Sequence, residues 1–186
     1  MKSIGVSAVA LLGAFAVLSL SGCVASSTPA SSPVSTTSTD YKLSHFAVDP
    51  PAATDTVLRV SGDSVCLYKM GELDAMAVTS ISLFERFYKK TETFRGVWLA
   101  KLFAKSGLKS SDTVALIALD GYRYKDTVAH LLTSKAFLAV SEDGKAISAD
   151  TGGPIRVVFP DNTKFSDVSD PWVWSLLTIA RSERGQ

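Results

Sequence analysis

The sequence predicts an α+β domain, in which a mixed β-sheet carries a few short helices. Short runs rich in β-branched and aromatic residues outnumber the runs with helical periodicity, and the two kinds alternate irregularly along the chain. Glycine, aspartate and proline, which have turn chemistry, separate these runs. An irregular order of this kind favours strands and helices that share one core over a regular repeat.

The first 22 residues have the pattern of a secretory signal peptide. Lys2 supplies a positive start, and the stretch from Ile4 to Leu20 is almost wholly apolar. The "LSGC" that follows resembles the bacterial lipobox, which implies cleavage before Cys23 and a lipid on that cysteine. A membrane-spanning helix is the weaker alternative, because such a helix needs roughly 20 apolar residues. The sequence therefore predicts a lipoprotein of the cell envelope, held to a membrane and facing away from the cytoplasm.

Residues 23–40 form the next segment, and after the cysteine they are dominated by serine, threonine, alanine and proline. A stretch of this composition buries too little apolar surface to offset its ordering entropy, so it is expected to be a tether. The remaining residues, 41–186, are expected to form one domain. A chain of that length buries a core without needing a disulfide or a metal.

The beginning of this domain is expected to consist of strands and one short helix. Two strands are predicted in 54–69, on either side of turn residues at 61–63, and one or two helical turns in 70–76. Residues 78–88 are rich in β-branched and aromatic side chains and are predicted to form a further strand.

The clearest helical pattern lies in residues 96–108. Leu99, Leu102 and Phe103 share one face at helical spacing, and Gly107 is a natural C-terminal stop.

The second half is predicted to contain strands, one helix and a long loop. The strands are expected at 112–119, 135–141, 155–159 and 172–180, the helix at 128–134 and the loop at 160–171. Asp-Gly pairs at 120–121 and 143–144 indicate turns, and the second is typical of a β-hairpin.

Charge and motifs exclude several classes of function. Loss of Lys2 with the signal peptide reduces the 19 basic residues to 18, which equals the 18 acidic residues, so nucleic-acid binding has no electrostatic support. The basic cluster at 87–95 is short and interrupted by Glu92, which fits a solvated strand end. Glycine-framed serines, P-loops, paired cysteines and zinc-helix motifs are absent, and His45 and His130 are too few for a triad or a multi-histidine site.

The other residues with chemical potential are expected to have structural roles. The acidic residues at 72–74, 142–143 and 161–170 are predicted to be solvated. Cys66 lies in an apolar run and is expected to be a buried, inert thiol. The three tryptophans are expected to fill the core, with a stacking platform for a ligand as the alternative.

One stretch, "TGGPIRVVFP" at 151–160, has features of an anion-binding loop. Gly152 and Gly153 allow a sharp turn or a close backbone approach, and Pro154 fixes the entry to the strand. Arg156 stands at the start of that strand, where its guanidinium is suited to pair with an anion in bidentate fashion. A turn with a surface arginine is the alternative.

The order of several stretches resembles the oxidoreductase molybdopterin-binding domain, which has the sulfite oxidase-like fold. The stretches are "FRGVWLAKLFAKSGL", "LDGYRYK", "VSEDGKAI", "TGGPIRVVFP" and the terminal tryptophan-containing strand, and together they cover about residues 55–180. The resemblance implies molybdopterin as the cofactor. It also implies that Tyr122, Gly152, Gly153 and Arg156 bind it.

The chain departs from the family's pattern in its metal-binding strand and its phosphate loop. In the family, the strand before "RGV" carries a cysteine whose sulfur binds molybdenum, and the corresponding stretch here has no cysteine. The loop that partly holds the pterin phosphate has the form His-Gly-X-Pro-X-Arg, and Thr151 stands here in place of its histidine. The family's basic residue before the last tryptophan strand is also missing.

These departures lead to two main hypotheses. The first is a membrane-anchored, non-catalytic binding or accessory module without molybdenum, which takes a small anion or an envelope protein as partner. The second is an envelope molybdopterin-dependent oxidoreductase with an unusual oxygen ligand, Ser80 or Ser82. A purely structural envelope protein with no ligand is a third possibility.

Overall fold

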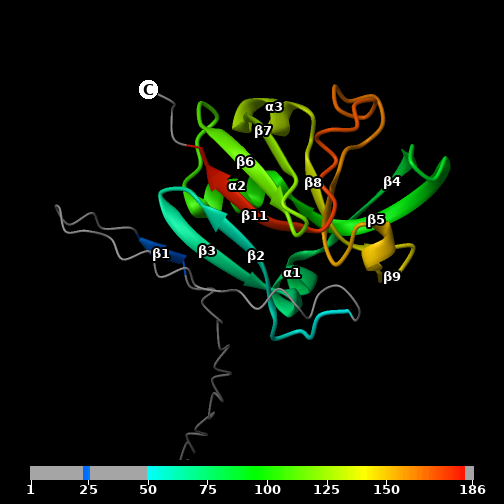
Figure 1. Ribbon diagram of the computed structural model, residues 1–186, viewed down its shortest axis with the longest axis horizontal. Helices are drawn as coiled ribbons and strands as arrows, with labels where there is room; N and C mark the ends of the chain where they lie inside the picture. The colour runs from blue at the N-terminus through cyan, green and yellow to red at the C-terminus, as the bar shows by residue number, and fades with distance from the viewer. Residues whose placement is uncertain (1–22, 26–49, 183–186) are drawn as a thin grey trace, which may run out of the picture.

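The computed structural model describes residues 23–25 and 50–182, whose strands form two sheets (Figure 1). The larger sheet has the strand order β1-β3-β2-β11-β6-β7. Its strands are β1 (Cys23–Ala25), β2 (Thr56–Ser61), β3 (Ser64–Lys69), β6 (Thr113–Ala118), β7 (Arg123–Thr127) and β11 (Leu176–Arg181). This sheet is mixed, because β11 pairs parallel with β2 and antiparallel with β6.

The smaller sheet is antiparallel throughout the described residues and has the order β10-β8-β5-β4, with β9 beside β8. Its strands are β4 (Thr79–Glu85), β5 (Lys90–Trp98), β8 (Phe137–Glu142), β9 (Lys145–Ala146) and β10 (Arg156–Val158). Figure 1 places this sheet beside the larger one. Both contribute to the same hydrophobic core, in which Phe94 and Val157 of the smaller sheet and Val60 and Ile179 of the larger are fully buried.

Three short α-helices complete the described part of the chain: α1 (Met70–Met76), α2 (Leu99–Ser106) and α3 (Val128–Thr133). The predicted apolar face of α2 is buried, and Gly107 ends the helix in the left-handed conformation, with φ of 73°. Helix α2 packs against β2, β3 and α3. The predicted α+β class, with a mixed sheet and a few short helices, is confirmed.

Three element predictions were wrong in part. Helix α2 begins at Leu99, because residues 96–98 continue β5 and pair with β8. The tryptophans at 172 and 174 lie in the loop before the last strand, which begins at Leu176. Strand β7 was not predicted, because no element was assigned between the turn at 120–121 and the helix at 128–134.

The prediction of an inert Cys66 thiol was also wrong, because the structure has Cys66 buried and disulfide-bonded. Cys23 is the other cysteine of the chain, and it lies opposite Cys66 in the β1–β3 register.

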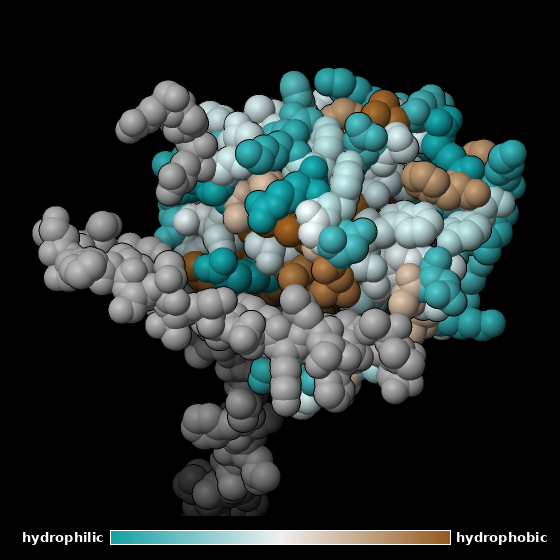
Figure 2. All heavy atoms as spheres, in the orientation of Figure 1, coloured by the Kyte–Doolittle hydropathy of each residue, from teal (hydrophilic) through white to brown (hydrophobic). Residues whose placement is uncertain are grey.

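The face shown in Figure 2 is mostly hydrophilic, with apolar residues in small separate groups. No helix in the described residues is long and apolar enough to span a bilayer. The predicted signal peptide, most of the predicted tether and His45 lie outside the described residues.

Candidate functional site

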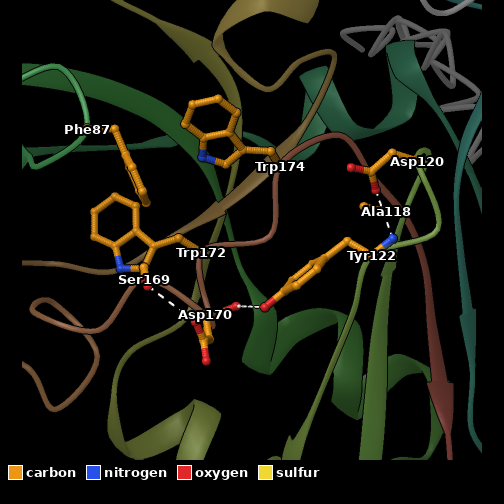
Figure 3. A pocket seen from close by; sticks show the side chains of 8 residues that line it. All are labelled: Phe87, Ala118, Asp120, Tyr122, Ser169, Asp170, Trp172 and Trp174. Carbon is orange, nitrogen blue, oxygen red and sulfur yellow. Dashed lines mark hydrogen bonds between the residues drawn. The ribbon is translucent and has the colours of Figure 1, made fainter.

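An aromatic cleft of about 340 Å³ lies where the β4–β5 turn, the β6–β7 turn and the loop before β11 meet (Figure 3). Phe87, Trp172 and Trp174 gather on one side of it, and Tyr122 lies on the other. The complete lining is Phe87, Ala118, Asp120, Tyr122, Ser169, Asp170, Trp172 and Trp174. Trp172 is buried in the hydrophobic core, as predicted, and it also lines the cleft, whereas Trp174 is only partly buried, so the predicted alternative of a tryptophan platform fits Trp174 better.

Hydrogen bonds fix the shape of the cleft wall. The Tyr122 hydroxyl donates to the Asp170 carbonyl at 3.0 Å, and its backbone N–H donates to the Asp120 carboxylate at 2.8 Å. Partial burial and then the nearby Asp170 raise the pKa of Tyr122, so this hydroxyl stays protonated at neutral pH. The Trp172 indole N–H donates to the Phe165 carbonyl at 2.8 Å.

The charged side chains that line the cleft are the carboxylates Asp120 and Asp170. Within the described residues, neither has a lysine, arginine or histidine within ion-pair distance. Their negative charges favour a cation and disfavour an anion. This result runs against the small anion expected from the sequence.

Arg156 is fully buried, and its guanidinium carbon lies 4.7 Å from the centre of the Trp174 ring, which lines the cleft. One terminal nitrogen donates to the Glu85 carboxylate and the other to the Thr151 carbonyl, both at 2.8 Å. Its Nε has no partner among the described residues and has almost no exposed surface. A phosphate therefore reaches this guanidinium only if Trp174 or Glu85 moves.

Gly152 and Gly153 hold the loop close to the chain around it. The Gly152 φ of 88° lies in the left-handed region, and a Cβ there would lie 2.6 Å from the Trp174 ring. The backbone N–H of Ser175 donates to the Gly152 carbonyl, and the Ser175 hydroxyl donates to the Gly153 carbonyl, both at 2.7 Å. The loop thus packs directly against the Trp174 side chain.

The structure divides the four predicted cofactor-binding residues into two sets. Tyr122 lines the cleft, while Gly152, Gly153 and Arg156 are buried on the other side of Trp174. The arginine is not a surface residue of a turn. It instead forms a buried ion pair with Glu85, a partner that the sequence analysis did not name.

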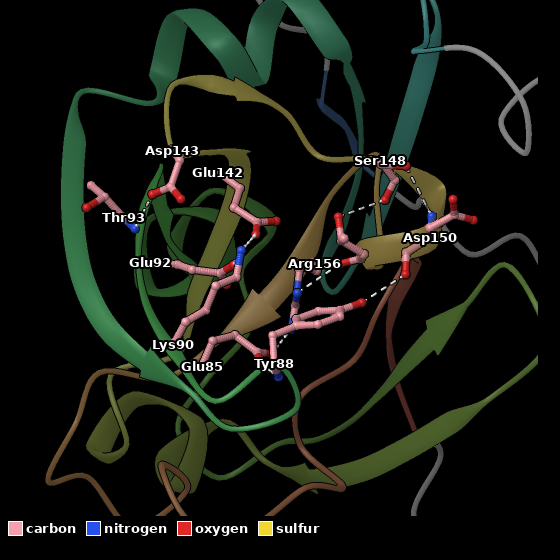
Figure 4. A network of polar contacts seen from close by, with 11 residues as sticks. Glu85, Tyr88, Lys90, Glu92, Thr93, Glu142, Asp143, Ser148, Asp150 and Arg156 are labelled. Carbon is pink, nitrogen blue, oxygen red and sulfur yellow. Dashed lines mark hydrogen bonds and ion pairs between the residues drawn. The ribbon is translucent and has the colours of Figure 1, made fainter.

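The sequence analysis also missed a group of buried carboxyl groups on β5 and β8. Glu92 is 1% exposed, forms an ion pair with Lys90 and lies beside Glu142, whose carboxylate is 3.9 Å from the Lys90 ammonium (Figure 4). Glu92 is therefore not part of a solvated strand end, and Glu142 is not a fully solvated loop acid. Burial and then the neighbouring Glu92 raise the pKa of Glu142 to about 7. Alternation with buried Phe94 along β5 is the signal that identifies Glu92 as inward-facing.

This carboxyl pair predicts a pH-dependent stability. The folded chain holds the Glu142 proton more tightly than the unfolded chain, where the pKa is near 4.5, so this group's contribution to stability falls as pH rises from about 4.5 to about 7. Glu142→Gln cannot ionise and should gain stability relative to wild type by on the order of 1 kcal/mol between pH 5 and pH 8, a figure reduced for solvent screening. Urea denaturation at both pH values measures the difference.

Glu92→Gln provides the second variant for this test. It removes the neighbouring carboxylate, so the effect of Glu142→Gln on stability should change less with pH in that background. A Glu142→Gln effect of equal size at pH 5 and pH 8 in the otherwise wild-type chain would show that folding does not raise the pKa of Glu142.

The other polar side chains in the described residues do not form a second candidate site. The His130 Nδ1 lies 2.7 Å from Asp126, and its side chain is half-exposed on α3, as expected of a surface histidine. No group of three or more histidine, cysteine or acidic side chains in the described residues is placed to hold a metal ion.

The two sheets and the Gly-Gly-Pro-X-Arg loop beneath the cleft define a sulfite oxidase-like domain. The family described as the oxidoreductase molybdopterin-binding domain matches residues 62–184, and the chain belongs to that family. The chain is similar to the sulfane dehydrogenase SoxCD of Paracoccus pantotrophus, whose crystal structure superimposes with a TM-score of 0.57 at 15% sequence identity. A comparison with curated proteins gave no match.

The similarity to SoxCD is one of fold. It covers 74% of this chain and 40% of the SoxCD chain, so this protein spans less than half the length of that relative. Fold similarity at this identity carries no activity with it.

Proposed function

We propose that this protein is a lipid-anchored, extracytoplasmic binding module that uses the molybdopterin-binding fold without the cofactor. The cleft is its ligand site. Catalysis is not part of this role.

The charge distribution around the cleft carries the proposal. Molybdopterin is anionic through its phosphate, whereas the charged groups lining the cleft, Asp120 and Asp170, are carboxylates. The family's arginine is present as Arg156, but its terminal nitrogens are bound to Glu85 and Thr151. The stretch where the family has its metal-binding cysteine contains none. The residues present therefore do not fit the cofactor.

The serine-ligand alternative has no geometric support. Burial alternates along β4, with Leu83 and Glu85 buried and Ser80 and Ser82 exposed on the opposite face. The Ser82 hydroxyl also shares a 2.9 Å hydrogen bond with Thr93. Both serines thus lie on the face of β4 opposite Glu85, the residue that contacts Arg156.

The membrane anchor rests on the lipobox-like sequence before Cys23. It requires that the mature chain lacks the Cys66 disulfide described above. A lipidated cysteine has no thiol left for a disulfide, so a lipid on Cys23 and a bond from Cys23 to Cys66 exclude each other. The mass of the mature chain distinguishes them. A diacylglyceryl group attached to the cysteine sulfur through a thioether adds on the order of several hundred daltons, and a disulfide removes two hydrogens.

The test uses the full chain, expressed with its own leader in a bacterial host that makes molybdopterin and purified in a maltoside detergent. Elemental mass spectrometry measures molybdenum, and fluorescence after oxidation measures pterin. We expect both to be far below one per chain. Near-stoichiometric molybdenum and pterin in the folded protein would refute the binding-module proposal.

The same preparation tests the anchor. We expect the protein in the membrane fraction, with a mature mass that begins at an acylated Cys23. A Cys23→Ser chain should retain its leader or appear in the soluble fraction. An unmodified Cys23 in the wild-type chain would refute the anchor and leave the cofactor result untouched.

A further inference from the structure

From the cleft's aromatic walls and carboxylates, we infer that its ligand is a small quaternary ammonium ion. This inference rests on the proposed function, because it names the ligand class for the same site. The cleft volume of about 340 Å³ falls in the range of about 300–1,000 Å³ that small-molecule sites occupy.

Two of the four aromatic side chains of the cleft are exposed, whereas Trp172 is buried. Phe87 is 46% exposed and Tyr122 is 42% exposed, and they lie on opposite sides of the cleft. Large apolar side chains that gather in an exposed hollow are typical of a binding site. A ligand with an apolar surface would cover both rings at once.

The geometry of the aromatic rings suits a cation surrounded on several sides. Phe87 meets Trp174 at a centroid distance of 5.3 Å and an angle of 76°, and meets Trp172 at 6.2 Å and 71°. Rings set nearly at right angles do not form a flat stack. The Trp174 ring already contacts the Arg156 guanidinium, so the exposed rings of Phe87 and Tyr122 are the ones that attract the methyl groups of an ammonium ion, which carry its positive charge.

Charge then selects a cation over a neutral molecule of the same shape. Asp120 and Asp170 are the charged groups that line the cleft, and no cationic side chain in the described residues neutralises them. Tyr122 contacts the Asp120 carboxylate through its backbone N–H and the Asp170 backbone carbonyl through its hydroxyl. The Asp120 carboxylate is therefore held beside an aromatic ring, and Asp170 lies next to the same ring.

The aromatic character of the lining favours a methylated ammonium over a primary amine. A primary ammonium is strongly hydrated, and it needs several hydrogen-bond acceptors to replace its lost water. A quaternary ammonium has no N–H group, so its contacts with rings and carboxylates suffice. Choline is a suitable probe, because 3,3-dimethylbutan-1-ol has the same shape without the charge.

The experiment is a titration of the full chain in maltoside, followed by tryptophan fluorescence. Trp172 and Trp174 line the cleft, whereas Trp98 does not and gives a constant background. We expect saturable quenching by choline, with an affinity at least about ten-fold above that for 3,3-dimethylbutan-1-ol, since cation–π and charge contacts are worth on the order of 1.4 kcal/mol here. Equal affinities, or no saturable signal with choline, would overturn the inference.

Variants separate the contributions of charge and aromatic rings. Asp120→Asn with Asp170→Asn should lower choline affinity about ten-fold and leave the neutral alcohol unchanged. The matched control, Asp143→Asn with Asp161→Asn, removes the same charge from carboxylates outside the cleft lining and should leave choline affinity unchanged. Phe87→Leu should cost about three-fold through the lost ring.

Glycerophosphocholine distinguishes a free cation from a lipid headgroup as the source. Its phosphate lies next to the ammonium and is repelled by the two carboxylates, so a site for a free cation should bind it more weakly than choline. If glycerophosphocholine binds as tightly as choline or more tightly, the ligand is a lipid headgroup that carries a quaternary ammonium.

This titration and the cofactor measurement can fail independently. Pterin in the purified chain refutes the binding module whatever choline does. Absence of both pterin and choline binding refutes only the ligand class.

Discussion

Replacing Arg156 with methionine should destabilise the domain by about 3–5 kcal/mol, because it leaves a buried carboxylate without its cation. Glu85 and Arg156 are both fully buried, and their ion pair measures 2.8 Å. The other Glu85 oxygen accepts from the Tyr88 backbone N–H at 2.8 Å, which does not neutralise its charge. Denaturation in guanidinium chloride measures the loss.

The control for this variant is Arg86→Met. Arg86 pairs with Asp167 on the surface, where both side chains are substantially exposed, so its loss should cost less than about 1 kcal/mol. If Arg156→Met fails to fold, the double variant Glu85→Leu with Arg156→Met decides the matter. It removes both buried charges and should recover most of the lost stability.

The outcome for Arg156 also bears on the cofactor. If Arg156 has only a structural role, Arg156→Met should be unstable and the double variant should fold. Neither variant should change the pterin content. If Arg156→Met lowers the free energy of unfolding no more than Arg86→Met does, the buried ion pair is contradicted. Arg156 would then be available to bind a phosphate.

Gly153→Ala should also destabilise the domain strongly, by about 3 kcal/mol, since overpacking against backbone leaves little room for relaxation. A Cβ at Gly153 would lie 1.9 Å from the Ile147 carbonyl oxygen and 2.6 Å from its carbon. The Gly153 N–H donates to the Ser148 carbonyl at 2.7 Å, which fixes the two segments together. Thermal unfolding followed by circular dichroism measures the effect.

Gly144→Ala is the matched control for steric crowding. A Cβ there meets nothing within 4 Å, but the φ of 76° is unfavourable for alanine, so the expected cost is about 1 kcal/mol. A Gly153→Ala chain as stable as the Gly144→Ala chain would show that the loop does not pack against Ile147 as described.

Sequence reasoning located most of the elements, because their signals are local. The β2–β3 hairpin follows from turn residues between two apolar runs, and α2 follows from one apolar stripe and a terminal glycine. The β8–β9 hairpin follows from its Asp-Gly pair. Strand β5 was missed because an inward-facing Glu92 hides the alternation of its apolar residues.

The candidate site was only partly predictable, because its members come from separate turns and loops. Tyr122 follows β6, Phe87 follows β4, and Trp174 precedes β11. No spacing along the chain indicates that these three aromatic residues share a cleft. The glycines and the arginine of the 151–160 loop were correctly singled out, but their burial could not be read from their order.

The sequence by itself determined the α+β class, the family resemblance and the missing cysteine, since each depends on residue types in chain order. Only the tertiary structure decided where the charges lie. It paired Arg156 with Glu85, which lies far from it in the sequence, and it buried both side chains, with the Arg156 guanidinium against the Trp174 ring. It also left Asp120 and Asp170 at the cleft. The physical reason is that a side chain's burial and charge partners depend on contacts between distant segments, which local patterns do not encode.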